Sequence, residues 1–310
     1  MLDRRLLFVT GKGGVGKTSV AAGLAVLASG QGKRVLICDV DGEGDLRLAF
    51  ESPPLSFAPQ SVGPNLFAMA MSTEEALKEY LRVHLRVPFA GRLGPVARSF
   101  DFVASAAPGV REILTVGKLA HEVRERSYDL VVVDAPATGH VVGQLAAPKA
   151  IHDLVKVGLV REQTQWMLDI LRDPDTTGTV IVATPEEMPV AETLQLAKSL
   201  ESETDVHLAA VVVNRVLPEP FSMAEEVAFA SLAEDDAMRV ITAAAGDGIG
   251  TVLQGVQTAV DMRRSRAPHI ARLRRELPSE TPLLFLPEIF GRTKGIRTTR
   301  KIAEALEEEL

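Results

Sequence analysis

Gly11-Lys12-Gly13-Gly14-Val15-Gly16-Lys17-Thr18 is the stretch that decides the fold. It matches the phosphate-loop pattern G-x-x-x-x-G-K-[ST], follows an apolar run over 6–10 and precedes a helical pattern. Glycines let backbone N–H groups surround phosphate oxygens, Lys17 reaches the β- and γ-phosphates, and the Thr18 hydroxyl ligates Mg²⁺. The N-terminus of the following helix adds positive charge. The expected phosphate-binding residues are Gly11, Gly13, Gly14, Val15, Gly16, Lys17, Thr18 and Ser19.

Outward from this loop, short apolar runs alternate with helical patterns along the whole chain. Several runs are apolar throughout, which is typical of strands buried on both faces. The alternation predicts an α/β fold with a mostly parallel, doubly wound P-loop NTPase sheet and helices on both faces. The expected strands cover 6–10, 34–40, 66–71, 129–135, 179–185, 207–215 and 282–288, and the expected helices 17–30, 73–87, 109–126, 149–172, 187–201, 223–245, 250–276 and 294–309.

The chain is expected to form a single domain over residues 1–310. The region 51–127 is too long for a plain crossover and carries prolines and phenylalanines between its helical patterns. We therefore expect a helical subdomain over the sheet, with helical elaborations at about 51–127 and 141–175.

Composition limits the classes of function. The chain has 310 residues, a net charge of −7, 46% hydrophobic and 24% charged residues, which is typical of a globular protein rather than a disordered one or a generally basic nucleic-acid binder. Cys38 is its one cysteine, which excludes an internal disulfide and any site needing two thiolates from this chain. No apolar run approaches the roughly 18 residues that cross a bilayer, so we expect a cytoplasmic protein.

Polar residues follow several of the expected strands, where ligands of parallel sheets bind. Asp39 and Asp41 follow the second strand, and carboxylates there can orient an attacking water or support Mg²⁺. Asp134 ends a later apolar strand and is expected to hold Mg²⁺ with Thr18, directly or through water. Asn214 follows the run AAVVV, and its amide can both donate to and accept from adenine.

Lys12 places the loop in a narrower group. GKGGVGKT resembles the deviant Walker A motif of the ATPase class that includes chromosome-partitioning ATPases, the nitrogenase iron protein and the arsenite-pump ATPases. The resemblance implies ATP and Mg²⁺ as cofactors and a nucleotide-sandwich dimer. Lys12 is then expected to act in trans on the partner's phosphates, as a catalytic residue beside Lys17 and Asp41.

Two further stretches resemble the arsenite-pump and tail-anchored-protein-targeting ATPase family. One stretch, Asp134-Ala135-Pro136-Ala137-Thr138-Gly139-His140, is close to that family's D-T-A-P-T-G-H. Pro148 and Pro108-Gly109 also stand where the family has the same residues. Asp41 falls on the aspartate that aligns the water, although Gly42, Glu43 and Gly44 replace the family's Pro, Ala and His. Asn214, Pro185 and Pro287 match its nucleotide-side loops. The chain is identified as an anion-transporting ATPase-like member, similar to small bacterial paralogues.

The process that ATP drives is less constrained. With a single cysteine, arsenite as substrate and a zinc-binding CxxC pair are not expected. The resemblance implies a dimeric ATP-driven switch, as a homodimer or a heterodimer with a paralogous ATPase, acting on a membrane-protein or membrane-transport partner. Helix 149–172 carries an apolar face that fits either a client groove or core packing. The alternative is a partitioning or positioning ATPase that binds DNA or membrane, supported by the arginines of 262–275, although alternating acids favour a solvated face and make DNA an unfavoured partner.

Overall fold

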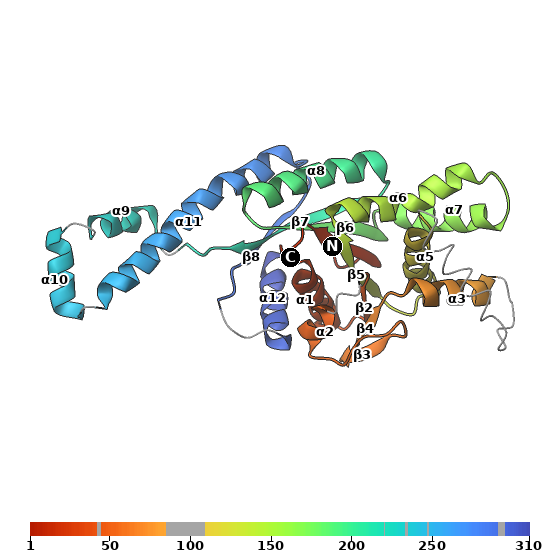
Figure 1. Ribbon diagram of the computed structural model, residues 1–310, viewed down its shortest axis with the longest axis horizontal. Helices are drawn as coiled ribbons and strands as arrows, with labels where there is room; N and C mark the ends of the chain where they lie inside the picture. Colours follow the sequence, from red (N-terminus) through yellow and green to blue (C-terminus); the bar gives the residue numbers. More distant parts are fainter. Residues whose placement is uncertain (42–44, 85–108, 220, 233–234, 247, 291–294) are drawn as a thin grey trace.

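A computed structural model of the chain describes residues 1–41, 45–84, 109–219, 221–232, 235–246, 248–290 and 295–310. Its centre is an eight-stranded sheet, parallel at every described pairing except that between the first two strands in spatial order. That order is β3 (Gln60–Gly63), β4 (Leu66–Ala70), β2 (Val35–Asp39), β5 (Leu130–Ala137), β1 (Leu6–Gly11), β6 (Thr177–Ala183), β7 (Leu208–Val216) and β8 (Leu283–Pro287). The expected α/β sheet is confirmed (Figure 1), and the strand order places β1, which precedes the phosphate loop, in the middle of the sheet.

Helices cover both faces of the sheet, because its central strands are buried on both sides. In β1, Leu7 and Val9 pack in one core while Leu6 and Phe8 pack in the other. The first core receives α1 (Lys17–Gly30), α2 (Asp45–Phe50) and α12 (Ile296–Glu309). The second receives α5 (Val110–Glu125), α6 (Thr138–Leu154), α7 (Leu159–Arg172), α8 (Glu187–Glu203) and the C-terminal part of α11 (Ile249–Glu276).

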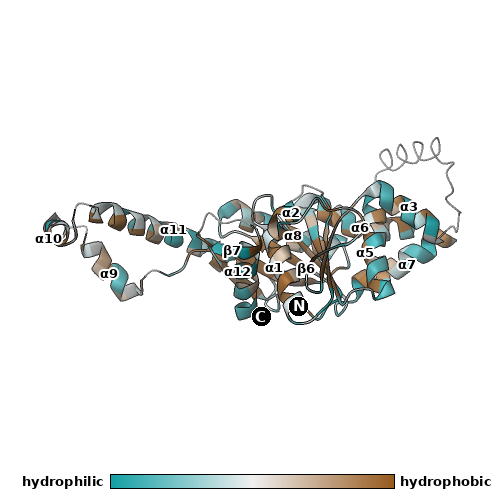
Figure 2. Ribbon diagram, turned by 90° about the horizontal axis from the view of Figure 1, so that it is seen from below, coloured by the Kyte–Doolittle hydropathy of each residue, from teal (hydrophilic) through white to brown (hydrophobic). Residues whose placement is uncertain are grey.

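Two helical groups extend from opposite ends of the sheet (Figures 1 and 2). At one end, α3 (Thr73–His84) joins α5, α6 and α7 in what we call the helical arm. At the other end, α9 (Met223–Ser231), α10 (Asp235–Ala245) and the N-terminal half of α11 project away from the sheet. The sheet therefore lies between two helical groups.

The helix after β5 differs from the expected one. A single helix was expected over 149–172, but α6 begins at Thr138 and ends at Leu154, and α7 starts after Gly158, whose φ of 95° favours glycine. Gly139, Gly143 and Pro148 are poor helix formers, so the first part of α6 carries little helical signal in the sequence. The expected helix 223–245 is likewise two helices, α9 and α10.

Helices α1 and α12, which cover the same face of the sheet, pack closely against each other. A Cβ atom on Gly23 of α1 would lie 2.6 Å from Cγ2 of Ile302 on α12. Glycine at this place lets the two helix backbones approach, and the Thr299 hydroxyl of α12 donates to the backbone oxygen of Ala49 at 3.0 Å. These contacts bring α12 beside the phosphate loop.

Candidate nucleotide-binding site

Two glycines of the phosphate loop are required by close contacts. Gly11 has a φ of 148°, and a Cβ atom there would lie 2.2 Å from the backbone oxygen of Val182 in β6. Gly16 has a φ of 95° and would place a Cβ atom 2.5 Å from Nδ2 of Asn214. The chain thus turns from β1 into α1 where larger side chains do not fit, and the N-terminus of α1 faces the loop.

The loop forms one wall of a cavity of about 540 Å³. The other walls come from the carboxyl ends of β2 and β5 and from α2 and α12, where ligands of such sheets bind. A volume of this size suits a small-molecule ligand. Its lining residues include Gly13, Gly14, Gly16, Lys17, Thr18, Ser19, Asp39, Asp41, Asp134, Arg215, Thr298 and Ile302.

Thr18 and Asp134, the two expected Mg²⁺ ligands, lie together. The Thr18 hydroxyl donates to Oδ2 of Asp134 at 2.6 Å, while Oδ1 of Asp134 is buried and has no hydrogen-bond partner among the described residues. Burial raises the pKa of Asp134 to about 7, with nearby Asp39 and Asp41 adding to the rise and Thr18 and Lys17 opposing it. A buried carboxylate oxygen beside a hydroxyl fits Mg²⁺, which takes oxygen ligands and is held by few protein groups plus phosphate.

The two lysines of the loop have different partners. Nζ of Lys17 lies 3.5 Å from the backbone oxygen of Lys12, inside the loop. Nζ of Lys12 forms an ion pair at 2.7 Å with Oε1 of Glu192 on α8. Lys17 lines the cavity, whereas Lys12 is not among the lining residues and is paired with α8 of its own chain.

The expected switch residues lie at neighbouring strand ends. Asp39 is buried at the end of β2, and Asp41 is exposed and lines the cavity. Asp134 is in β5, and His140 is exposed in the first turn of α6. Gly42, Glu43, Gly44 and Pro108 lie outside the described residues.

Asn214 braces the loop. Its Nδ2 donates to the backbone oxygen of Val15 at 2.9 Å, and its Oδ1 accepts from the backbone N–H of Arg215 at 2.9 Å. Pro185 lines a separate cavity of about 400 Å³ beside the end of β7, and Pro287 is exposed at the end of β8. Adenine recognition by these three residues stays a prediction.

Comparison with known protein families shows to which family the chain belongs. A family model described as "Anion-transporting ATPase" matches residues 4–163 and 156–235. The chain belongs to this family. The match covers β1 to α9, and therefore the phosphate loop, Asp41, Asp134 and Asn214.

Relatives of this anion-transporting ATPase have several names. It is 34% identical over 225 residues to "ATPase BagA" of Mycobacterium tuberculosis, a match that covers 69% of this chain and 66%, just under two thirds, of that protein. It is 29% identical to the "Arsenical pump-driving ATPase" of Acidiphilium multivorum, over 69% of this chain and 40% of the relative. It is 27% identical to "ATPase GET3" of Podospora anserina, over 73% of this chain and 78% of the relative.

The sequence did not indicate several cavity residues of this family member. Thr298, Thr299 and Ile302 come from α12, which carries no motif, and they reach the cavity through the packing of α12 on α1. Arg215 follows Asn214 and has a φ of 59°, which turns the chain at the end of β7. In the sequence, its place directly after Asn214 is the signal that could have pointed to it.

No helix in the described ranges is both long enough and apolar enough to span a membrane.

Proposed function

We propose that the chain is a Mg²⁺- and ATP-dependent ATPase that works as a dimeric switch on a membrane-protein or membrane-transport partner. The observation that carries the enzymatic part is the meeting of the phosphate loop, Lys17, the Thr18–Asp134 pair and Asp41 around one cavity. Phosphoryl transfer needs mainly positioning and charge stabilisation, and these residues supply both.

Each residue has a part in this proposal. Lys17 and the loop N–H groups bind the β- and γ-phosphates, and Thr18 and Asp134 hold Mg²⁺. Mg²⁺, when bound, neutralises charge that develops on the phosphate oxygens. The exposed carboxylate of Asp41 accepts a hydrogen bond from the attacking water and turns it toward the γ-phosphate.

Dimerisation is proposed as part of the switch. Members of this family typically dimerise. Lys12 belongs to the phosphate loop and has 28% of its side chain exposed, so it can exchange Glu192 for a phosphate held by a partner. The partner is a second copy of the chain or a paralogous ATPase.

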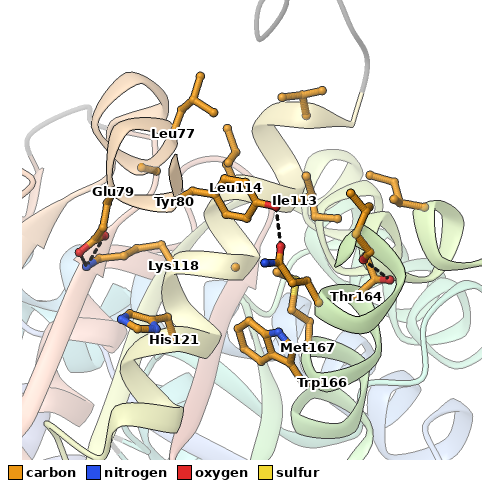
Figure 3. A pocket seen from close by; sticks show the side chains of 16 residues that line it. Leu77, Glu79, Tyr80, Ile113, Leu114, Lys118, His121, Thr164, Trp166 and Met167 are labelled. Carbon is orange, nitrogen blue, oxygen red and sulfur yellow. Dashed lines mark hydrogen bonds and ion pairs between the residues drawn. The ribbon is translucent and has the colours of Figure 1, made fainter. Parts of the chain in front are cut away.

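The helical arm supplies an apolar surface for the membrane partner. A cavity of about 230 Å³ lies between α3, α5, α6 and α7, lined largely by apolar side chains (Figure 3). Among its polar groups, Lys118 pairs with Glu79 at 2.7 Å and the Tyr80 hydroxyl donates to Oε1 of Gln163 at 2.5 Å, while Nε2 of Gln163 has no partner among the described residues. The apolar lining includes Leu77, Ile113, Leu114, Ile151, Val160, Trp166 and Met167.

Exposed apolar residues continue this surface at the turn between α6 and α7. Leu154 is 80% and Val157 82% exposed, and Leu159 and Val160 are each 43% exposed. Four exposed apolar side chains within seven positions are the kind of feature that marks an interaction site. They support a hydrophobic protein segment as the partner.

The alternative of a DNA-binding positioning ATPase has weaker support. Arginines of 262–275 could neutralise phosphates only if they were free. Arg263 pairs with Glu219 at 2.5 Å, Arg264 with Glu226 at 2.7 Å, and Arg272 and Arg275 with Glu276. These ion pairs favour an internally compensated helix face.

The test begins with the purified chain and with Asp41→Asn. The wild type is expected to hydrolyse ATP with Mg²⁺. Asp41→Asn is expected to bind ATP, to hydrolyse it at least tenfold more slowly and to remain in the closed dimer. Lys17→Ala is the control, because it cannot hold the phosphates. Normal hydrolysis by Asp41→Asn would contradict the role of Asp41, and absence of hydrolysis by the wild type and a paralogue together would overturn the proposal.

The partner is then identified by isolating Asp41→Asn with ATP from the source cells, followed by mass spectrometry. Proteins with a single transmembrane helix, or a membrane channel, retained by Asp41→Asn and lost from Lys17→Ala support the proposed partner. DNA or septum components retained in the same way would favour the positioning alternative.

A further inference from the structure

A second, smaller cavity lies on the other side of Asp41. It has a volume of about 140 Å³, and Asp41 lines both this cavity and the nucleotide cavity. Its other walls come from the ends of β2 and β5, the first turns of α5, and α6: Val40, Arg111, Glu112, Thr115, Pro136, His140 and Gln144. Asp41, the residue expected to orient the water, therefore belongs to the walls of both cavities.

Gln144 is the unexplained group of this cavity. Its side chain is on α6 and is 3% exposed, yet neither Nε2 nor Oε1 has a hydrogen-bond partner in the described parts of the chain. An unpaired buried amide costs about 1–3 kcal/mol for each group left unsatisfied, and unpaired groups in native proteins often have a functional reason. A methionine or leucine would fill the same space without this cost.

The other polar groups around the cavity are accounted for. The Thr115 hydroxyl donates to the backbone oxygen of Arg111 at 2.9 Å. Arg111 and His140 are exposed and Glu112 is partly exposed, so water can satisfy them. Gln144 is thus the lining side chain whose polar atoms are both buried and unpaired within the described range.

We propose that Gln144 is a positioning residue for ATP hydrolysis, whose Nε2 donates to the Asp41 carboxylate when nucleotide is bound. The amide satisfies both needs of the site, because its N–H donates to the carboxylate and its oxygen accepts from water in the cavity. A carboxylate fixed by such a bond holds the attacking water in one orientation, which raises the rate of the chemical step without changing the affinity for ATP. This inference rests on the proposed ATPase function.

Helix α6 lines both the small cavity beside Asp41 and the apolar cavity of the helical arm. Gln144 is one turn after His140, and Ile151, two turns further on, lines the apolar cavity of the helical arm. A shift of α6 when the arm is occupied would therefore move the amide relative to Asp41.

The first variant is Gln144→Met, which keeps the volume and removes both polar atoms. We expect kcat for ATP hydrolysis to fall about tenfold, KM for ATP to change less than twofold and Tm to stay the same or rise. The matched control is Thr179→Val in β6, which removes another buried, unpaired polar atom from a part of the strand away from the loop. This control is expected to keep both kcat and KM.

The second variant is Gln144→Glu, measured as a pH profile of kcat. An ionised glutamate repels Asp41, whereas a protonated one can donate a hydrogen bond as the amide does. We expect kcat to be low at pH 8.5 and to recover toward the wild-type value as pH falls to 6. This readout also decides the case if Gln144→Met does not fold.

The outcomes separate this inference from the proposed function. An active wild type with Gln144→Met within twofold of its kcat, or a flat pH profile of kcat for Gln144→Glu relative to wild type, overturns the role of Gln144 alone. A wild type that hydrolyses no ATP under any tested pairing overturns the proposed function and the inference with it.

Discussion

Nζ of Lys12 lies 2.7 Å from Oε1 of Glu192, so the second lysine of the phosphate loop is bound to α8 of its own chain. The side chains are 28% and 32% exposed. Ion pairs that solvent can reach contribute only about 0–1 kcal/mol, so a phosphate can replace Glu192 at small cost. The ion pair with Glu192 is therefore consistent with a Lys12 side chain that can leave its own chain and bind the phosphates of a partner.

Glu192→Gln is expected to favour the ATP-bound dimer. The substitution keeps the shape and removes the negative charge that competes for Lys12, so the dimer fraction at subsaturating protein should rise two- to fivefold with ATP and Mg²⁺. Sedimentation velocity with and without ATP measures this. Glu201→Gln, an exposed acid on the same helix, is the control. A dimer fraction equal to that of the control would contradict competition by Glu192.

Lys17→Ala and Lys12→Ala should separate binding from closure. Loss of Lys17 removes the cation inside the loop and is expected to abolish nucleotide binding, while Lys12→Ala should keep binding within a few-fold and lose hydrolysis and the closed dimer. A fluorescent ATP analogue reports binding, and phosphate release reports hydrolysis. Equal ATPase rates for wild type and Lys12→Ala would contradict a role in trans.

The buried carboxyl of Asp134 makes the nucleotide-free protein sensitive to pH. Its pKa in the folded state is about 7, above the unfolded value, so the folded state binds more protons between these two pKa values. The stability from the protonated carboxyl is full below the unfolded pKa and is lost as pH rises through about 7. Asp134→Asn should therefore gain stability relative to wild type at pH 8, and gain little at pH 4.5.

Denaturant unfolding at the two pH values, without nucleotide, measures this difference. Binding of Mg²⁺ and ATP at pH 7 should also release roughly half a proton from Asp134, seen by calorimetry in buffers of different ionisation enthalpy. Equal proton release by Asp134→Asn would assign the proton to another group.

Asn214 can be tested for two distinct roles. As a brace, its amide bonds to Val15 and Arg215 shape the loop, so Asn214→Ala should weaken ATP and GTP equally, about tenfold. As a reader of adenine, its loss should weaken ATP alone. Affinities for both nucleotides, measured on wild type and variant, distinguish the roles, and an unchanged ATP affinity would contradict both.

The features that could be predicted from sequence are those with a local pattern. The phosphate loop and Asp134 lie in recognisable sequence motifs, and the strands β1, β2 and β5 are predicted directly from their runs of apolar residues. β3 has four residues without a strong apolar pattern and forms only by pairing with β4 at the sheet edge. Packing of this kind lies outside any local window.

The rest of the site depends on contacts between distant parts of the chain. Thr298 and Ile302 enter the cavity wall because α12 packs on α1, and nothing in the C-terminal residues marks them. Gln144 lies in a stretch with glycines and a proline that reads poorly as a helix, so its buried, inward position was not apparent. Local motifs identify the chemistry, and the packing of α12 and α6 decides what surrounds it.

The contact between Gly23 and Ile302 has a consequence for synthesis on the ribosome. Ile302 follows Gly23 by 279 positions (302 − 23), so during translation the face of α1 that packs on α12 stays uncovered until those residues have been made. Closing so long a loop is slow, and until then the cavity lacks the α12 wall. A nascent chain can thus carry a formed phosphate loop before it carries a complete nucleotide pocket, which places the onset of ATP binding late in biogenesis.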